Sequence, residues 1–342
     1  MGSQNRDPIE PHMSELKYSL WRQSPTLSSD DRNLPEVGLS GLGSRHIFPS
    51  GRQAITEIMQ RITGGRASRV SIPEWSSHCV VSSVGRVATP IPLHEVLKGN
   101  HRVDAVLVYD QYGWPKRADS LSALSKHVDA AIVHDCVDSL TGFEDRLPDG
   151  VTHRVWSLSK TLGFLNGGAA RSRNEFIEFP KDERAVSDTD VAMARAADPI
   201  AREFAKSWLP YRDTALLSAL DGGALSSIVS REILHRRSLL KIFLSSAFAA
   251  DIPEWMKIAA QNGAAPNLVP CVLGAGPSRM QRRQQLICDV QERFRLEARV
   301  YHFDFSDDPM SPSYRSAIVL PIHGEITDQV FSDTIAYLEK SR

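Results

Sequence analysis

One lysine stands among small hydroxyl residues in the segment VWSLSKTLGFLNGGAA, which spans residues 155–170. Lys160 follows two serines, of which Ser157 is the first, and a Gly-Gly pair comes seven residues later. A lysine is most often an ordinary solvated side chain. In a pocket that lowers its pKa, the same amine is a nucleophile that forms a Schiff base with a carbonyl. The other candidate residues of the sequence indicate which of these interpretations applies to Lys160.

A Pro-Ser-Gly sequence before a predicted helix offers a possible site for an anion. Ser50 and Gly51 precede residues 53–62, in which apolar residues recur at helical spacing. The free N–H groups and the positive dipole end of a helix start can bind phosphate. The same sequence is also typical of a simple helix cap.

Two further candidates follow predicted strands. Trp75 could stack on a flat ring, or it could belong to the core. Asp135 ends an apolar run, where its carboxylate could pair with a protonated ring nitrogen or cap the next turn. With Lys160 and the helix start, these features describe one ligand that has a phosphate, a flat ring, a pyridinium nitrogen and an aldehyde. That ligand is pyridoxal 5'-phosphate (PLP), which requires a Schiff-base lysine and an acidic partner.

The elements that position these residues alternate along the chain. Short apolar runs predict strands, and the segments between them have helical periodicity. This alternation indicates an α/β fold with a mostly parallel sheet covered on both faces, in which ligands gather at the carboxyl ends of the strands. Trp75, Tyr112, Asp135 and Lys160 all follow such ends. The predicted strands are 68–72, 87–91, 105–109, 130–134, 151–158 and 316–321, and the predicted helices are 53–62, 78–84, 121–127 and 328–339.

Changes of composition divide the chain into four parts. Residues 1–12 are typical of an expression tag, and the polar residues 13–44 indicate an N-terminal arm. We expect a large cofactor-binding domain over residues 45–225 and a smaller C-terminal α/β domain over residues 226–342.

Charge and composition exclude several classes of function. Forty basic against forty-one acidic residues give no support to nucleic-acid binding. The sequence contains no apolar run of membrane-spanning length and no signal-peptide core, so we expect a cytoplasmic protein without membrane contact. Four scattered cysteines match neither a disulfide framework nor a metal site, and we expect no metal.

In the order of these motifs, the chain resembles fold-type I PLP enzymes, and most closely the DegT-like aminotransferase family. The resemblance covers residues 45–342. HIFPSGRQAI is similar to the family's phosphate segment, and VLVYDQYGWPKRADSLSALSKHVDAAIVHDCVDSL follows its progression from Tyr-Gly-x-Pro through a helix and a strand to aspartate. LSKTLGFLNGGAA resembles the lysine segment. SIPEWSSHCVVSSVGRVATPIPL and IVLPIHGEITDQVFSDTIAYLEK resemble its aromatic block and its carboxy-terminal strand and helix.

The resemblance implies a role for each candidate residue. Lys160 forms the Schiff base and shuttles protons, Asp135 keeps the ring nitrogen protonated, and Trp75 stacks on the ring. Tyr112 and Arg315 are candidates for contact with the substrate, Arg315 for its carboxylate or phosphate. The phosphate group is assigned to Ser50, Gly51, the backbone of Arg52 and Gln53, and the hydroxyl of Ser157.

Three features depart from the family pattern. Asp138 stands three residues after Asp135, where the family usually has Gln or His near the cofactor's phenolic oxygen. Ser157 lies closer to the lysine than the family's serine does, a spacing similar to that of α-oxoamine synthases. The asparagine segment that reaches the partner subunit's phosphate has no clear match, although LPYRDTALL at residues 209–217 could replace it.

The resemblance implies a homodimer with its active site at the interface, into which Arg212, Arg231, Arg236 or Arg237 could project. The expected function is an aminotransferase that moves an amino group from a small-molecule donor to a keto substrate, which is a sugar or a biosynthetic intermediate. Two alternatives stay open. One is a PLP-dependent lyase, decarboxylase or synthase on the same scaffold, and the other is a homologue that binds PLP without catalysis.

Overall fold

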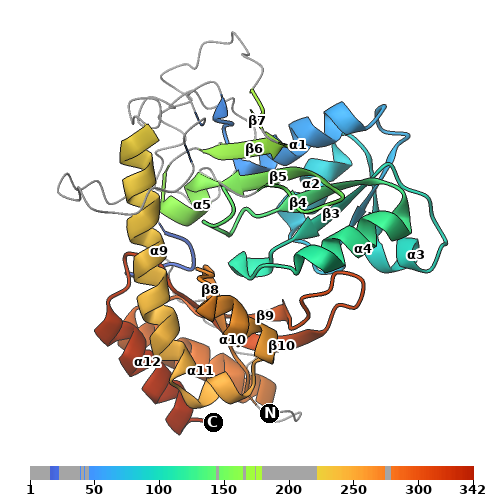
Figure 1. The fold of residues 1–342 in the computed structure, drawn as a ribbon. Coiled ribbons are helices and arrows are strands. Elements are labelled where there is room, and N and C mark those ends of the chain that lie inside the picture. Colours follow the sequence, from blue (N-terminus) through green and yellow to red (C-terminus); the bar gives the residue numbers. More distant parts are fainter. Residues whose placement is uncertain are drawn as a thin grey trace, which may run out of the picture.

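The computed structural model describes residues 16–22, 39, 42, 46–143, 146–164, 167–173, 175–178, 222–273 and 279–342. Residues 1–12, segment 209–217 and Arg212, which figured in the predictions, lie outside these ranges. Figure 1 shows a large sheet with helices on both sides and a second group of helices and strands formed by the C-terminal part of the chain.

Seven strands form the large sheet, in the order β2-β1-β3-β4-β5-β6-β7. They are β1 (Arg69–Ile72), β2 (Thr89–Pro92), β3 (Ala105–Tyr109), β4 (Ala131–Asp135), β5 (Val151–Ser157), β6 (Gly168–Ser172) and β7 (Glu175–Phe176). The five strands from β2 to β5 pair in parallel, whereas β6 and β7 pair antiparallel with their neighbours. The mostly parallel α/β sheet predicted from the sequence is therefore confirmed.

Residue alternation along the strands explains why helices cover both faces of this sheet. Within β3, Ala105 and Leu107 join one apolar cluster, and Val106 and Val108 join another, because successive side chains point to opposite faces. The helices are α1 (Gly51–Ile62), α2 (His78–Gly85), α3 (Leu93–Leu97) and α4 (Ala118–Val128). Helices α1 and α2 supply apolar residues to the first cluster, and α3 and α4 supply them to the second, which makes three layers (Figure 1).

Three antiparallel strands form the small sheet, in the order β8-β10-β9. The strands are β8 (Leu268–Cys271), β9 (Arg299–Asp304) and β10 (Tyr314–Pro321). They share an apolar core with α9 (Gly222–Leu244), α10 (Glu254–Gln261), α11 (Arg279–Phe294) and α12 (Asp328–Lys340). Strand β10 and helix α12 include the predicted strand and helix at the end of the chain. No described helix has the combination of length and apolar character that crossing a membrane requires.

Helix α9 connects the cores of the two sheets. Near its start, Ile228 and Val229 lie in an apolar cluster with residues of β5 and β6, whereas Leu240 and Phe243 lie in the core of the small sheet. The predicted domain boundary between residues 225 and 226 falls inside this helix and stays a prediction.

Candidate active site

The carboxyl ends of four parallel strands bring the predicted residues to one edge of the large sheet. Trp75 follows β1, Tyr112 follows β3, Asp135 ends β4, and Lys160 follows β5. These four strands are neighbours in the sheet and run in the same direction. Their carboxyl ends therefore meet at one edge, which is where α/β sheets bind ligands.

Lys160 lies on the short helix α5 (Leu158–Leu162), which begins directly after β5. The hydroxyl of Ser157 caps this helix and accepts the Lys160 N–H at 3.4 Å. The Lys160 ammonium lies 3.3 Å from a carboxylate oxygen of Asp138 and 4.5 Å from the ring centroid of Trp21. The side chain of Lys160 is 34% exposed.

Opposing effects set the charge of Lys160. Burial disfavours the ammonium, but Asp138, Cys79 and Asp135 together outweigh burial and raise the Lys160 pKa above its ordinary value. An amine has to be neutral before it can attack a carbonyl. The proton must therefore leave Lys160 first, and Asp138 is the carboxylate already in contact with it.

Asp135 is a buried carboxyl group beside this lysine. It is 3% exposed, and one of its oxygens accepts the Val137 N–H at 3.0 Å. Burial raises the pKa of Asp135 to about 7, and the neighbouring Asp138 acts in the same direction. Since an opposite charge favours the ionised form of a carboxyl, this position suits a cationic ligand group such as a protonated ring nitrogen.

The start of α1 lies against the end of β5. A Cβ atom at Gly51 would lie 3.0 Å from the side chains of both Ser157 and Val137, so a larger residue here would require these side chains to shift. The positive end of the α1 dipole thus lies next to the Ser157 hydroxyl, a combination that fits a phosphate group. The Gln53 N–H donates to Ser50 Oγ at 3.2 Å, and its predicted role as a phosphate ligand stays a prediction.

The Gly167-Gly168 pair gives this segment its shape. The Gly167 carbonyl accepts the Leu158 N–H at 2.7 Å at the start of α5, and Gly167 has a φ of 130°, which residues with a Cβ rarely adopt. A Cβ at Gly168 would collide with the backbone of Ser50. The glycine pair seven residues after Lys160 therefore lets the strand that starts at Gly168 pass close to the start of α1.

Trp75 joins this edge to the small sheet. Its side chain is 52% exposed, and its ring stacks on His302 of β9 with the centroids 3.8 Å apart and the planes at 19°. Tyr314 of β10 makes an edge contact with the same ring at 6.4 Å. The predicted stacking of Trp75 on a cofactor stays a prediction.

Tyr112 lies at the border of the site. It has a φ of 55° and stacks on Tyr301 of β9 at 5.5 Å. The next residue, Gly113, is so close to Asp138 that a Cβ there would lie 2.6 Å from the Asp138 carbonyl oxygen. The structure thus brings Tyr112 next to the Lys160–Asp138 pair.

Arg315 lies elsewhere. Its guanidinium lies 3.8 Å from the ring centroid of Phe305 and donates to the Asp251 carbonyl at 3.2 Å. Its neighbour Tyr314 bonds to the hydroxyl of Tyr109 at 2.8 Å, at the end of β3. Because successive residues of a strand point to opposite faces, Arg315 points away from the edge that holds Lys160.

The prediction that Arg236 could project into a partner chain is wrong. Its side chain is fully buried and donates to Glu232 and to the Thr161 carbonyl, each at 2.8 Å. A guanidinium without exposed surface cannot reach a second molecule. Arg237 donates to the Gly263 carbonyl at 3.0 Å, and its proposed role, like that of Arg231, stays a prediction.

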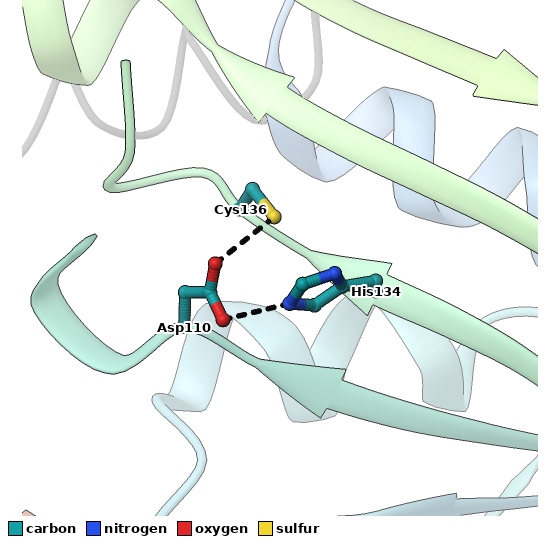
Figure 2. A group of neighbouring side chains, drawn as sticks. All are labelled: Asp110, His134 and Cys136. Carbon is teal, nitrogen blue, oxygen red and sulfur yellow. Dashed lines mark hydrogen bonds and ion pairs between the residues drawn. The ribbon is translucent and has the colours of Figure 1, made fainter. Parts of the chain in front are cut away.

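A buried hydrogen-bonded group beside Asp135 is absent from our sequence-based predictions (Figure 2). His134 Nε2 lies 2.7 Å from one carboxylate oxygen of Asp110, and Cys136 Sγ donates to the other at 3.3 Å. The ligand atoms of the three side chains lie within 4.8 Å of one another, close enough for a metal ion. His134 and Arg154 oppose the effect of burial and lower the Asp110 pKa. We interpret the group as a network that ties β3 to β4, because the Asp110 carboxylate bonds to both other side chains and to the Lys116 N–H, and Arg154 disfavours a further cation.

A sequence signal for this network existed. Residues on either side of Asp135 in a strand share the face opposite to it, so His134 and Cys136 had to point the same way. Trp21, the other residue that we missed, had a weaker signal: it is an aromatic residue within a polar arm.

The sequence was compared with family models and with curated proteins. Residues 41–189 match a family model described as "Putative PLP-dependent aminotransferase", and this segment contains Ser50, Trp75, Asp135 and Lys160. No curated protein matches the sequence.

Two solved structures share the fold over nearly the whole chain. One is "Putative sugar aminotransferase Spr1654 from Streptococcus pneumoniae, PLP-form", with a TM-score of 0.54, 13% identity, and coverage of 94% of this chain and 97% of that one. The other is "Helicobacter pylori PseC, aminotransferase involved in the biosynthesis of pseudoaminic acid", with a TM-score of 0.54, 12% identity, and coverage of 94% and 99%. At such identity these likenesses establish the fold, and they confirm the fold class that the sequence predicted.

Proposed function

We propose that this chain, a relative of the PLP-dependent aminotransferases with their fold, is itself an aminotransferase for a small keto substrate. The observation that carries the proposal is one cluster at the sheet edge, where the Lys160 amine, the buried Asp135 and the α1 start beside Ser157 come together. These groups match the aldehyde, the ring nitrogen and the phosphate of PLP. A keto sugar or a related biosynthetic intermediate is the proposed acceptor, since both solved structures named above are aminotransferases and one is described as acting on sugars.

When bound, PLP would supply an electron sink for the bond that breaks at the substrate carbon. The chain's own residues would do the rest. Lys160 would hold the cofactor and move a proton at the substrate carbon, and Asp138 would hold the Lys160 ammonium in position until the amine loses its proton. Asp135 would keep the ring nitrogen protonated, because a carboxylate with an elevated pKa gains from an adjacent positive charge. The Ser157 hydroxyl and the α1 start would anchor the phosphate.

Two finer features of this proposal concern assembly and location. We propose a homodimer with the site at the interface, to which the half-exposed Trp75 would contribute buried area. We propose the cytoplasm as its location. All four cysteines are free thiols, which suits a reducing compartment.

The test starts from the purified protein and added PLP. We expect a visible absorption band from the Schiff base, which Lys160→Ala abolishes and the control Lys126→Ala, on an exposed part of α4, retains. An amino donor should then bleach the band, and a keto acceptor should restore it. Failure to take up PLP would contradict the whole proposal. Release of carbon dioxide or of a leaving group, without amino transfer, would favour the lyase or synthase alternative.

A further inference from the structure

The N-terminal strap, which we define as residues 16–22, is fixed to the C-terminal part of the chain. Tyr18 forms a bridge with Leu296, and the Leu20 N–H donates to a Glu297 carboxylate oxygen at 2.9 Å. The Leu20 carbonyl accepts a bond from Asn267 at 3.2 Å. Tyr18, Leu20 and Arg22 are all buried. The strap is therefore an integral part of the fold.

The strap places Trp21 at Lys160. The neighbours of Trp21, Leu20 and Arg22, point into the protein, and Arg22 forms an ion pair with Glu232. With both neighbours fixed, the Trp21 ring lies over the Lys160 ammonium at 4.5 Å. A cation over an aromatic face is attracted by the electrons of the ring, and tryptophan gives the strongest such contact.

Groups from several distant segments act on this ammonium. Asp138 is its ion-pair partner, and Trp21 is its aromatic contact. Among the described residues, Cys79 of α2, Asp135 of β4 and Tyr301 of β9 are further titratable groups that interact with it. Trp21 is the contact that comes from the strap, and it lies 139 residues before Lys160 in the chain.

We propose that Trp21 is an active-site residue, which positions the Lys160 amine and covers it in the loaded enzyme. The inference rests on the proposed function only where it concerns the loaded enzyme. In the protein without cofactor, the ring stabilises the ammonium next to Asp138 and fixes the direction in which the amine points. The strap thereby links the packing of the C-terminal part of the chain to the reactive end of the large sheet.

The first experiment uses the full chain without cofactor. An amine-specific acetylating reagent is applied over a range of pH, and mass spectrometry of the peptide that holds Lys160 gives its labelling rate. In Trp21→Leu we expect the midpoint of the pH profile to move to lower pH, because the neutral amine is less disfavoured. Labelling at a fixed pH below the midpoint should be about two- to fivefold faster. Easier access alone would raise the high-pH plateau and leave the midpoint in place.

Two matched variants decide what causes the shift. Trp21→Phe keeps an aromatic ring and should move the midpoint less than Trp21→Leu does. Trp255→Leu makes the same change in a tryptophan that packs on Trp114 and donates to the Phe305 carbonyl, and it should leave the midpoint unchanged. An unchanged midpoint in Trp21→Leu, or equal shifts in the Leu and Phe variants, would overturn the proposal.

The second experiment adds PLP. Uptake should quench the fluorescence of Trp21 by energy transfer, so the fluorescence lost on uptake should be smaller in Trp21→Phe than in the wild type. Equal losses would overturn the claim that Trp21 covers the loaded site. A chain that shows the midpoint shift but takes up no PLP contradicts the proposed function and leaves the placement of Trp21 over Lys160 supported. Normal uptake with an unmoved midpoint contradicts the role of Trp21 alone.

Discussion

Two clusters of cations and carboxylates lie close together in this protein. They differ in how well the positive charges balance the negative ones within each cluster. The buried ion cluster consists of Arg22, Glu232 and Arg236. Both arginines bond to the Glu232 carboxylate, and the Gly324 N–H adds a further bond. Against the effect of burial, Arg236 and Arg22 lower the Glu232 pKa. Every group of this cluster is buried, and its carboxylate is firmly ionised.

The reactive cluster consists of Lys160, Asp138 and Asp135. It holds two carboxyl groups for one ammonium, which is partly exposed, and the Asp135 pKa is raised to about 7. A buried carboxyl group whose pKa is raised in this way does not add to the stability of the fold. The difference indicates that the charges of the buried ion cluster are balanced within the fold, whereas those of the reactive cluster are not, which supports the ligand proposed for it.

The two clusters are also physically joined. Trp21 contacts Lys160 while the adjacent Arg22 contacts Glu232, and Arg236 donates to the carbonyl of Thr161, the residue after Lys160. The buried ion cluster therefore holds the backbone beside Lys160 in the reactive cluster.

The largest effect on stability should follow from Glu232→Ala. It leaves two arginines buried without their carboxylate, and we expect a loss of about 3–5 kcal/mol in the free energy of unfolding. Urea denaturation measures it. Glu254→Ala breaks an exposed pair with Lys257 and should change stability by less than about 0.5 kcal/mol. A small loss in Glu232→Ala would mean that the buried ion cluster is not the support we describe.

Asp135→Asn should raise the free energy of unfolding, whereas Glu232→Ala lowers it. The folded chain without cofactor binds a proton at Asp135 between the ordinary pKa of 3.8 and about 7, so its stability falls as the pH rises through that window. Above pH 7 the variant should be more stable than the wild type, by up to about 4 kcal/mol. At acid pH the two should be equal.

Denaturation at several pH values tests this prediction, with Asp119→Asn as a control on an exposed carboxylate. The same Asp135→Asn variant should bind PLP poorly, because the ring nitrogen loses its partner. A variant less stable than the wild type above pH 7 would place Asp135 among the structural carboxylates.

Arg22→Met tests the connection between the clusters. It removes one of the two cations bonded to Glu232 and should cost about 1.5–3 kcal/mol, which is the range for hydrogen bonds to charged groups. Because Arg22 fixes the strap beside Trp21, the Lys160 labelling midpoint should also move to lower pH. Loss of stability without that movement would separate the two clusters.

Asp138→Asn should have the smallest energetic effect. The partly exposed Lys160 loses its ion-pair partner, so its pKa falls and its labelling at a fixed pH becomes roughly two- to fivefold faster. The free energy of unfolding should change little. Slower labelling would show that Asp138 takes up the amine proton as a base more than it holds the ammonium.

Much of the fold follows from local pattern in the sequence. The apolar run at residues 105–109 became β3 without a shift, and predicted helix 328–339 became α12 with one added residue. Side chains that repeat every second or every 3.6 residues report burial directly. The edge that holds Asp135 and Lys160 was predictable for the same reason, because the ends of parallel strands have to meet.

Contacts between distant segments did not follow from these patterns. Only packing decides that Arg236 is fully buried on Glu232 and that Arg315 lies on Phe305. Likewise, the stacking of His302 on Trp75 depends on how the small sheet meets the large one. No local periodicity encodes such a meeting.

The sequence alone determined the alternation of strands and helices and the edge to which Asp135 and Lys160 belong. Each of these depends on residues near one another in the chain. The tertiary structure decided that Asp138 and Trp21 are the partners of the Lys160 ammonium, and that Arg22 and Arg236 share one carboxylate behind it. These pairings join residues that are far apart in the chain. They form only when both sheets, α9 and the strap have packed together.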